Sequence, residues 1–394
     1  MVASALAVPA AWEAGWWADR DWSPLLPDWR VLHSRLTPND LETDPEWCRA
    51  IEAADPGTVR LLVLRRSGAV AAVVPALVKR GDLDCNLGEL RLAHFRPWLV
   101  ELPSALAQIV DDNAACSALF TALLQPPPSL HRLDGVRVTA PVASPLWAFL
   151  TGPELARPRR RRYAPSPPQQ HHVLRLPPSF AAYTAKFSPK TRKNRERELR
   201  HLERRGTLEL VPCRAAGEIE AFLQEAWRLS GRSYQHKLLR SGLRPPAQLR
   251  HRLQVAAERG WLRSYLLRCG GVSCSFMLGY QYGNHYYYTK VGYDPAWAAL
   301  SVGTVLQWLV LQDLYARDRP ELIDFGVQGP QKRYFGNDQF EEGSLCLFRP
   351  GWYPWLACAS HRRARRLTAA ASRWLGRYRL KAPAQRWLRR LSGC

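Results

Sequence analysis

An aspartate at the end of a predicted buried strand is the side chain best placed to do chemistry in this sequence. The apolar run 321–325 contains Asp324 near its end, and Gly326 and Gly329 follow it. A carboxylate in this position opens onto the end of the sheet, where it could orient or deprotonate an attacking amine or hydroxyl. Aspartate at a strand end also commonly caps a turn, so both interpretations of Asp324 stay open.

A second candidate site is the start of the helix predicted over 304–315. Ser301, Val302, Gly303 and Thr304 lead into its periodic apolar residues. Free N–H groups and the positive end of a helix dipole attract phosphate, so this segment could hold a phosphate-bearing co-substrate. A serine that only caps the helix explains the same residues.

A basic helix predicted over 188–206 could contact an anion. It begins with a serine cap followed by proline, and its first turns carry Lys190, Arg192 and Lys193. Nearly all of its charge is positive, and an anion would relieve the repulsion. A solvated surface helix is the alternative interpretation.

A compact polar cluster follows the next predicted helix. Tyr234, Gln235 and His236 could line an acceptor groove by hydrogen bonding and stacking. A junction between a helix and a loop that satisfies its own backbone groups explains them equally well.

The elements that position these residues follow a regular order. Gly270-Gly271 and Gly283-Asn284 separate three predicted antiparallel strands at 261–268, 272–282 and 285–293. A helix (304–315), a strand (321–325), a tight loop or short helix (326–336) and a last strand (344–348) come next. This β-β-β-α-β-α-β order is that of the GNAT acyltransferase core.

An apolar hairpin over 59–79 is similar to the hairpin over 261–282. When the two are overlaid, Leu64 falls on Leu267, and Gly68 falls on Gly271. Many strand-Gly-strand units share these residue types, but the match favours two related domains in tandem. We therefore predict an α/β (α+β) fold of tandem GNAT domains with mixed, mostly antiparallel sheets.

Proline and arginine dominate the segment between the two halves. Proline at this density disfavours both helix and central strand, so we predict a stiff, extended connector. The predicted organisation is a degenerate GNAT-like domain (1–150), the connector (151–178), a GNAT acetyltransferase domain (179–350) and a basic amphipathic tail (351–394).

Six short motifs occur in the same order as in a known family. They are Ser188-Pro189-Lys190-Thr191-Arg192-Lys193-Asn194, Gly231-Arg232-Ser233-Tyr234-Gln235, Tyr293-Asp294-Pro295, Ser301-Val302-Gly303-Thr304, Asp324-Phe325-Gly326, and Lys332 with Phe335-Gly336. The series resembles the CelD/BcsL acetyltransferase family, which is similar to the Fem peptidyltransferases. The resemblance implies a cytosolic acyltransferase tied to cellulose or other exopolysaccharide synthesis.

The resemblance also implies roles for single residues. Lys332 matches a lysine near the transfer site, where an ammonium group can stabilise the oxyanion of a tetrahedral intermediate. The family usually has tyrosine where this chain has Gln331. Tyr334 or Tyr288 would therefore have to supply the phenol. Ser301 to Thr304 would hold the pyrophosphate of acyl-CoA, although only Gly303 of the usual glycine-rich loop is present.

The excess positive charge is confined to two segments. Residues 157–205 hold 15 Lys/Arg against 3 Glu, and residues 361–394 hold 11 against none, within a total of +22. The second segment combines arginine with Leu367 and Trp374, which is typical of a helix at an anionic membrane surface. No apolar stretch is long enough to span a membrane, and the N-terminus lacks a secretory signal.

The scattered cysteines and the pair His171-His172 lack the spacing of a metal site, so we expect reduced thiols and no metal.

The favoured function is a cytoplasmic N- or O-acyltransferase, peripheral on the inner membrane, that uses acyl-CoA on a polysaccharide precursor. A Fem-like transferase with an aminoacyl-tRNA donor is one alternative, since basic residues neutralise RNA phosphates. A non-catalytic GNAT scaffold is the other.

Overall fold

The structure, a computed structural model, describes residues 12–36, 40–87, 90–110, 112–128, 130, 132–155, 161–232, 246–327 and 329–377. Tyr234, Gln235 and His236 lie outside this part of the chain. So do the tail residues beyond 377, while the surroundings of the Trp374 side chain are also not described.

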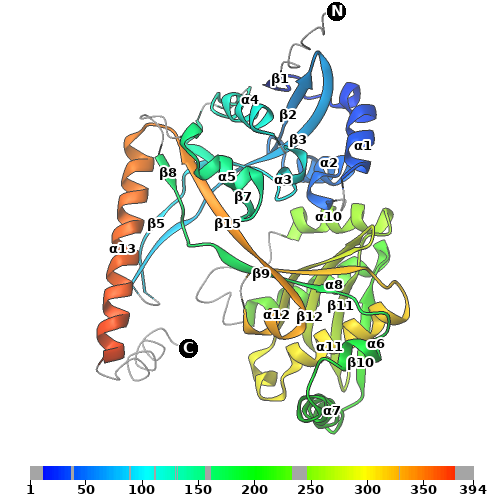
Figure 1. Cartoon of the computed structure of the whole chain (residues 1–394). Coiled ribbons are helices and arrows are strands. Elements are labelled where there is room, and N and C mark those ends of the chain that lie inside the picture. Colours follow the sequence, from blue (N-terminus) through cyan, green and yellow to red (C-terminus); the bar gives the residue numbers. More distant parts are fainter. Residues whose placement is uncertain are drawn as a thin grey trace, which may run out of the picture.

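One large sheet runs through the molecule and joins both halves of the chain (Figure 1). Its strands lie in the order β1-β2-β3-β6-β7-β15-β9-β14-β13-β12-β11-β10, and β8 pairs with β15. The bounds are β1 Trp12–Trp16, β2 Val59–Arg66, β3 Ala69–Arg80, β6 Trp98–Glu101, β7 Gly135–Pro141, β8 Arg161–Tyr163, β9 Gln169–Arg175, β10 Leu208–Cys213, β11 Ser264–Cys269, β12 Val272–Tyr282, β13 His285–Tyr293, β14 Leu322–Val327 and β15 Asp338–Phe348. Only β6–β7 and β13–β14 pair in parallel among the described strands. The sheet is mixed and mostly antiparallel, as predicted.

Helices cover both faces of this sheet. In the first half they are α1 Leu26–Ser34, η2 Leu41–Thr43, α2 Pro45–Ala54, α3 Leu106–Ile109, α4 Asn113–Leu123 and α5 Pro145–Thr151. In the second half they are α6 Phe180–Thr184, α7 Pro189–Glu203, α8 Ile219–Arg232, α10 Pro246–Glu258, η5 Pro295–Leu300, α11 Val302–Ala316, α12 Pro330–Phe335 and α13 Trp352–Arg377. α11 packs in one apolar core with α6 and α7, and α8 and α10 pack in another on the opposite face.

The two hairpins that the sequence overlay relates to each other have a register shift at the same position. β2 and β3 change register between Leu64 and Arg65, and β11 and β12 change register between Leu267 and Arg268. These positions coincide in the predicted overlay. A bulge adds a local bend and twist to a strand, so a shared bulge gives both hairpins the same curvature. The shared geometry supports the prediction of related tandem domains.

The two halves exchange their last strands. β15, which ends the second half, pairs with β7 of the first half over seven residue pairs. β9, which follows the first half, pairs with β14 of the second half and lies beside β15. Leu345 and Leu347 of β15 are consequently buried in the core of the first half. Each half therefore depends on the other for the strand that completes it.

The predicted connector contains a central strand, so the expectation that proline would exclude one is wrong. The prolines at 165, 167, 168, 177 and 178 lie before and after β9, and none lies within it. The backbone N–H groups of β9 are therefore free to pair on both sides. β9 carries His171, which reaches the centre of the molecule.

A short segment of the first half also packs directly on the second half. The Asp44 carboxylate accepts a hydrogen bond of 2.6 Å from the Tyr282 hydroxyl, and Trp47 packs edge-on against Tyr280 at 5.0 Å. The same aspartate caps α2 through the N–H groups of Glu46 and Trp47. η2 is therefore held above β13, with its acidic side chains facing the point where the halves meet.

The C-terminal helix begins one residue after the start of the predicted basic tail at 351. α13 starts at Trp352, and its inner side packs on β4 (Leu83–Leu87), β8 and β15. In the described part of the chain, no helix combines the length and the hydropathy that crossing a bilayer would require.

We expect Leu347→Ala to destabilise both halves together. Leu347 is 1% exposed and lies on an exchanged strand, so its truncation should lower the free energy of unfolding by about 2–5 kcal/mol. Urea unfolding followed by tryptophan fluorescence measures this change. Leu92→Ala, at a side chain that is 55% exposed, is the matched control and should change it by less than about 0.5 kcal/mol. Hydrogen exchange that accelerates only in the second half would contradict the strand exchange.

Candidate active site between the two halves

A cavity of about 420 Å³ lies where two pairs of parallel strands diverge. β13 and β14 pair over only three residue pairs, the last being Tyr287 with Asp324. β6 and β7 likewise pair only as far as Glu101 with Arg137. Residues just beyond both points line the same cavity, so both halves of the chain form its wall.

The cavity reaches through the sheet. Tyr288 packs with the core around α11, whereas Tyr287 packs with the core around α8 on the opposite face. Both tyrosines nevertheless line the cavity. Their alternation along β13 follows from the two-residue period of a strand. An extended ligand could therefore enter on the α11 side and present its end on the other side.

Asp324 lines the cavity and is firmly held. Its Oδ1 accepts a hydrogen bond of 2.6 Å from the Gly326 N–H and another of 2.7 Å from Nε2 of His171. Gly326 has φ of +70°, a conformation that glycine adopts without strain, and this lets the chain turn back toward the carboxylate. Asp324 thus caps a turn and also faces the cavity.

His171 bridges two carboxylates in the wall of the cavity. Its Nδ1 lies 3.3 Å from Oε2 of Glu342, opposite the bond to Asp324, and its ring stacks on Phe340 at 4.6 Å. Burial opposes charge on the imidazole, but the hydrogen bonds to Asp324 and Glu342 outweigh it and raise the pKa to about 9. His171 is therefore an imidazolium at neutral pH.

Two acidic residues, Glu42 of η2 and Asp40 at its N-cap, complete the wall from the first half. The Asp40 side chain is buried; its Oδ1 accepts a hydrogen bond from the Glu42 N–H, and its Oδ2 has no hydrogen-bond partner among the described residues. The Glu42 side chain is accessible to water from the cavity. Burial, and then the Asp40 charge, raises the pKa of Glu42 to about 7.

The cavity wall is acidic. Five carboxylates face it, from Asp40, Glu42, Glu101, Asp324 and Glu342, against the basic side chains of Lys79 and His171. Glu101 forms ion pairs with Lys79 and, at 3.9 Å, with Arg137. Of the five carboxylates, Glu42 and Asp40 form no ion pair among the described residues. At longer range, the Lys79 charge acts to lower the pKa of Glu42, and the His33 charge acts to lower that of Asp40.

Lys332 lies close to Asp324 but donates elsewhere. Its Nζ gives a hydrogen bond of 2.9 Å to the Val327 carbonyl and passes over Gly326. Burial lowers the pKa of Lys332, and the Asp324 charge counteracts this. The lysine is therefore beside the cavity and is not one of the residues that line it.

Tyr288 and Tyr334, the two tyrosines that could supply the phenol, lie in different surroundings. Tyr288 lines the cavity and contacts Phe325 edge-on at 5.7 Å, and burial raises the pKa of its hydroxyl. Tyr334 stacks on Phe187 at 5.0 Å and lies under the Arg195 guanidinium at 5.5 Å. The structure thus brings Tyr288, and not Tyr334, to the cavity with Asp324.

The segment Ser301 to Thr304 forms the N-terminus of α11, but not in the way that the sequence predicted. Ser301 adopts a left-handed conformation with φ of +55°, and its side chain makes no capping hydrogen bond. The expectation of a serine side-chain cap is therefore wrong. The Thr304 hydroxyl contacts Gln331 Nε2 at 3.3 Å, which ties α11 to α12. The segment is near the cavity without lining it.

The basic helix begins as predicted. The Ser188 hydroxyl accepts a hydrogen bond from the Thr191 N–H, and Pro189 follows it in the first turn. Lys190, Arg192 and Lys193 are exposed on α7 and do not reach the cavity.

No group of side chains suited to a metal ion occurs within the described residue ranges. The residues that sequence reasoning missed are Asp40, Glu42, Glu342 and, as a catalytic candidate, His171. The first two carry no motif in the sequence, and only the docking of η2 on β13 makes them neighbours of Asp324.

Comparison with known proteins agrees with this architecture. Residues 189–340 match the model of the acetyltransferase (GNAT) domain family. No curated protein matches the chain. The crystal structure of FemX superposes with a TM-score of 0.51 at 10% identity, over 81% of this chain and 95% of FemX. A tandem GNAT protein from the clavulanic acid biosynthesis pathway, solved without AcCoA, gives 0.50 at 11% identity, over 86% and 99%.

The chain therefore has the tandem GNAT fold, and its second half carries a GNAT acetyltransferase domain. At these identities the two solved structures indicate fold alone. The GNAT match supports an acyltransferase, without specifying the acyl donor or the acceptor.

We expect His171→Gln to remove a pH-dependent part of the stability. The folded pKa of about 9 exceeds the value of about 6.5 in an unfolded chain. The stabilisation is therefore complete below pH 6.5 and is lost as the pH rises through 9. Between pH 6 and pH 10, the stability difference between wild type and variant should shrink by up to about 3 kcal/mol.

Chemical denaturation at both pH values measures this difference. His201→Gln, at an exposed histidine of α7, is the matched control and should leave the difference near zero at each pH. A constant gap for His171→Gln would show that the imidazole carries no extra proton.

Proposed function

We propose that this protein is an acyl-CoA-dependent N-acyltransferase whose acceptor is an amine on a sugar unit of a polysaccharide precursor. The acidic cavity at the divergence of β13 and β14 carries the proposal, since this is where a thioester passing through the sheet would meet the acceptor. The polysaccharide link comes from the resemblance to the CelD/BcsL family, and we place the enzyme peripherally on a membrane.

The charge of the cavity favours an amine over a hydroxyl acceptor. An amine arrives as an ammonium ion, and Asp40 and Glu42 offer it carboxylates that form no ion pair with any residue that the structure describes, with the charges of His33 and Lys79 acting only at longer range. The buried Asp40 Oδ2 would gain its missing hydrogen bond from such a cation. A neutral hydroxyl would leave this charge uncompensated.

Glu42 is suited to remove the proton from the ammonium ion. A base works best when its pKa is near the working pH, and the pKa of Glu42 is raised to about 7. The free amine then attacks the thioester carbonyl, a C–N bond forms, the C–S bond breaks, and the thiolate leaves. Tyr288 stays neutral because burial raises its pKa, so it acts as a relay: its hydroxyl takes the second proton of the nitrogen as it gives its own proton to the departing sulfur.

Other side chains then act by position. We propose that Asp324 holds the His171 imidazolium in place, and that this charge, with Lys332 behind Gly326, stabilises the oxyanion. The N-terminus of α11 (Ser301, Val302, Gly303, Thr304) would hold the donor pyrophosphate through its N–H groups.

An aminoacyl-tRNA donor is the second candidate. The exposed basic residues of α7 (Lys190, Arg192, Lys193) favour it. Glu198 of the same helix interacts with Ser301, so α7 lies beside the proposed donor site. α7 could thus contact RNA phosphates next to the reacting ester.

We expect Glu42→Gln to lower kcat by about 10²- to 10⁴-fold in acyl transfer to an amino sugar. Wild-type activity should rise with pH through about 7 as Glu42 ionises, and the variant should lose this rise. Steady-state rates from pH 5.5 to 9 test both points. Glu341→Gln changes an exposed glutamate outside the cavity and is the control. An unchanged pH profile in Glu42→Gln would reject Glu42 as the base.

We expect Gly303→Asp to weaken acyl-CoA binding by about tenfold or more, since it adds a negative charge at the helix terminus. A Cβ atom added at 303 would lie 3.6 Å from the Tyr293 ring, an ordinary van der Waals contact, so the fold should tolerate the substitution. Calorimetry with acetyl-CoA measures the effect, with Gly217→Asp, where the added atom meets nothing within 4 Å, as control. No binding of acetyl-CoA by wild type, together with salt-sensitive binding of tRNA, would favour the second donor.

A further inference from the structure

The C-terminal helix α13 stands at one edge of the molecule with one side buried and one side open (Figure 1). Ala357, Cys358, His361 and Ala364 face inward and are buried. The Tyr163 hydroxyl hydrogen-bonds to Nδ1 of His361 in this interface. The orientation of the helix is therefore fixed by packing, and so is the set of side chains that it exposes.

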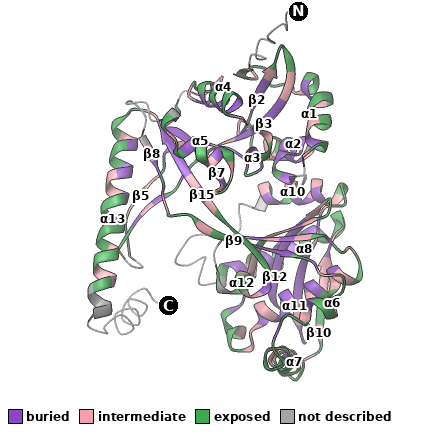
Figure 2. Ribbon diagram, in the orientation of Figure 1, coloured by how far each residue is buried: buried purple, intermediate pink, exposed green. Residues whose placement is uncertain are grey.

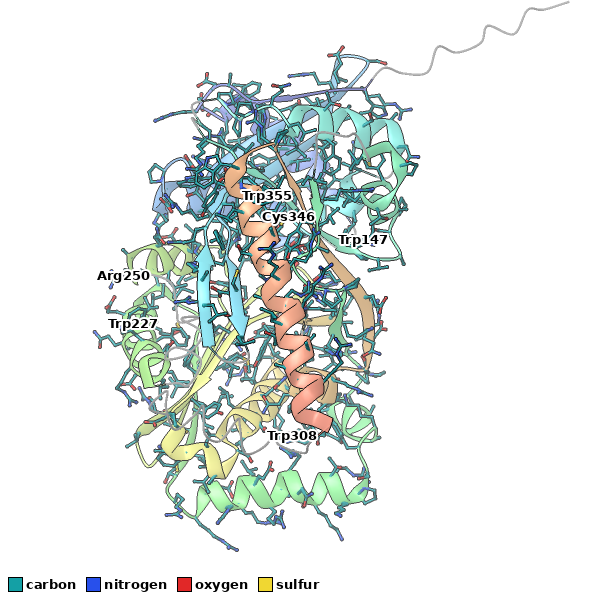
Figure 3. All side chains as sticks on the ribbon, turned by 90° about the vertical axis from the view of Figure 1, so that its left-hand side faces the viewer. Trp147, Trp227, Arg250, Trp308, Cys346 and Trp355 are labelled. Atoms are coloured by element: carbon teal, nitrogen blue, oxygen red, sulfur yellow. The ribbon has the colours of Figure 1, made fainter. Side chains whose placement is uncertain are left out.

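The outer face of α13 carries large apolar side chains in water. Trp352 is 75% exposed, Trp355 48%, Leu356 39% and Leu367 57%. Figure 2 shows the outer side of α13 as largely exposed, and Figure 3 shows Trp355 on the side where α13 faces the viewer. Exposed apolar side chains gathered on one face commonly mark an interaction surface.

An arginine groove runs along one flank of the same helix. We use this name for the cavity of about 430 Å³ lined by Arg162, Tyr163, Ala164, Arg362, Arg365, Arg366 and Ala369. No carboxylate lines it, and α13 contains no Asp or Glu from Trp352 to Arg377. Its positive charge is therefore not neutralised by the residues that form it.

Contacts within the protein hold this groove in shape. Arg162 donates from one nitrogen to the carbonyls of Thr151 and Gly152, both at 2.7 Å. Arg365 donates to the Pro165 carbonyl at 2.9 Å, and the Arg362 guanidinium lies over the Tyr163 ring at 5.7 Å. Each guanidinium has five N–H groups, so donors remain for a phosphate.

We propose that α13 docks on an anionic bilayer, with lipid headgroup phosphates in the arginine groove and Trp352, Trp355, Leu356 and Leu367 at the level of the headgroups. Tryptophan and arginine both favour this level of a membrane, where an apolar body and a polar group are satisfied together. RNA phosphates would also suit the arginines. The leucines, however, have no aromatic face for stacking on bases, and they favour lipid.

This inference specifies the membrane contact of the proposed function but does not rest on acyl transfer, because vesicle binding needs no substrate. The experiment is sedimentation of the full chain with vesicles of phosphatidylcholine alone or with added phosphatidylglycerol. Wild type should bind the anionic vesicles at least about tenfold more tightly, and added salt should weaken this binding.

Two pairs of exposed side chains separate charge from insertion. Arg362→Gln with Arg366→Gln should lower the affinity for anionic vesicles about tenfold or more. Trp352→Ala with Trp355→Ala should lower it to a similar extent at high salt, where charge is screened. The matched controls are Arg197→Gln with Arg200→Gln on α7, and Trp227→Ala on α8, which should bind like wild type. Circular dichroism confirms that each variant is folded.

Three outcomes would overturn the proposal. Equal binding to neutral and anionic vesicles would show that the arginine groove does not bind anionic lipid headgroups. Loss of tRNA binding, with unchanged vesicle binding, in the Arg362/Arg366 variant would assign the groove to nucleic acid. A dimer of wild type that Trp352→Ala with Trp355→Ala dissociates, with vesicle binding unchanged, would assign the apolar face to a second copy of this chain.

Discussion

The exchange of β9 and β15 between the halves is the constraint on which the site depends. β9 brings His171, and β15 brings Glu342, to the point where β14 leaves β13. If each half kept its own last strand, the imidazole and its two carboxylate partners would not meet. The pairing that completes the sheet is thus the same pairing that assembles the wall of the cavity.

Charge in this wall is balanced only in part. The His171 imidazolium satisfies Asp324 and Glu342, and Lys79 with Arg137 satisfies Glu101. Burying further carboxylates costs free energy, and proteins commonly meet that cost by raising the pKa. The buried Asp40 follows this rule, and its charge helps to raise the pKa of Glu42, which is exposed to the cavity, so a cation that binds between them would be stabilised by both. The raised pKa of these carboxyl groups and the amine preference that we propose have one physical origin.

Local patterns in the sequence predicted the helices and strands. They did not predict which strands pair or which segments pack together. The strand order from 264 to 348, the Ser188 cap and the paired hairpins follow from turn residues, apolar periodicity and internal similarity. Asp324 was identified because the sequence predicts a strand end beside it; β14 in fact continues to Val327, and only its pairing with β13 ends at Asp324. The sequence did not predict β9, because the prolines on both sides of it suggested an extended connector. The seven residues of β9 themselves contain no proline. Asp40 and Glu42 carry no local signal at all, because only long-range packing of η2 makes them part of the site.

The degenerate first half gains a role from this arrangement. Its own diverging strands, β6 and β7, open into the same cavity as β13 and β14, so the two repeats face each other across one space. The second half keeps a helix terminus behind its opening, where a donor phosphate can bind. The first half instead supplies the acidic side chains of Asp40 and Glu42 to the space between, and its Lys79 there is paired with Glu101. In the function that we propose, the duplicated fold divides the transfer reaction by charge: the second half holds the anionic donor, and the first half receives the cationic acceptor. In the same proposal, the carboxylates of Asp40 and Glu42 give the first half a role that needs no donor-binding residues.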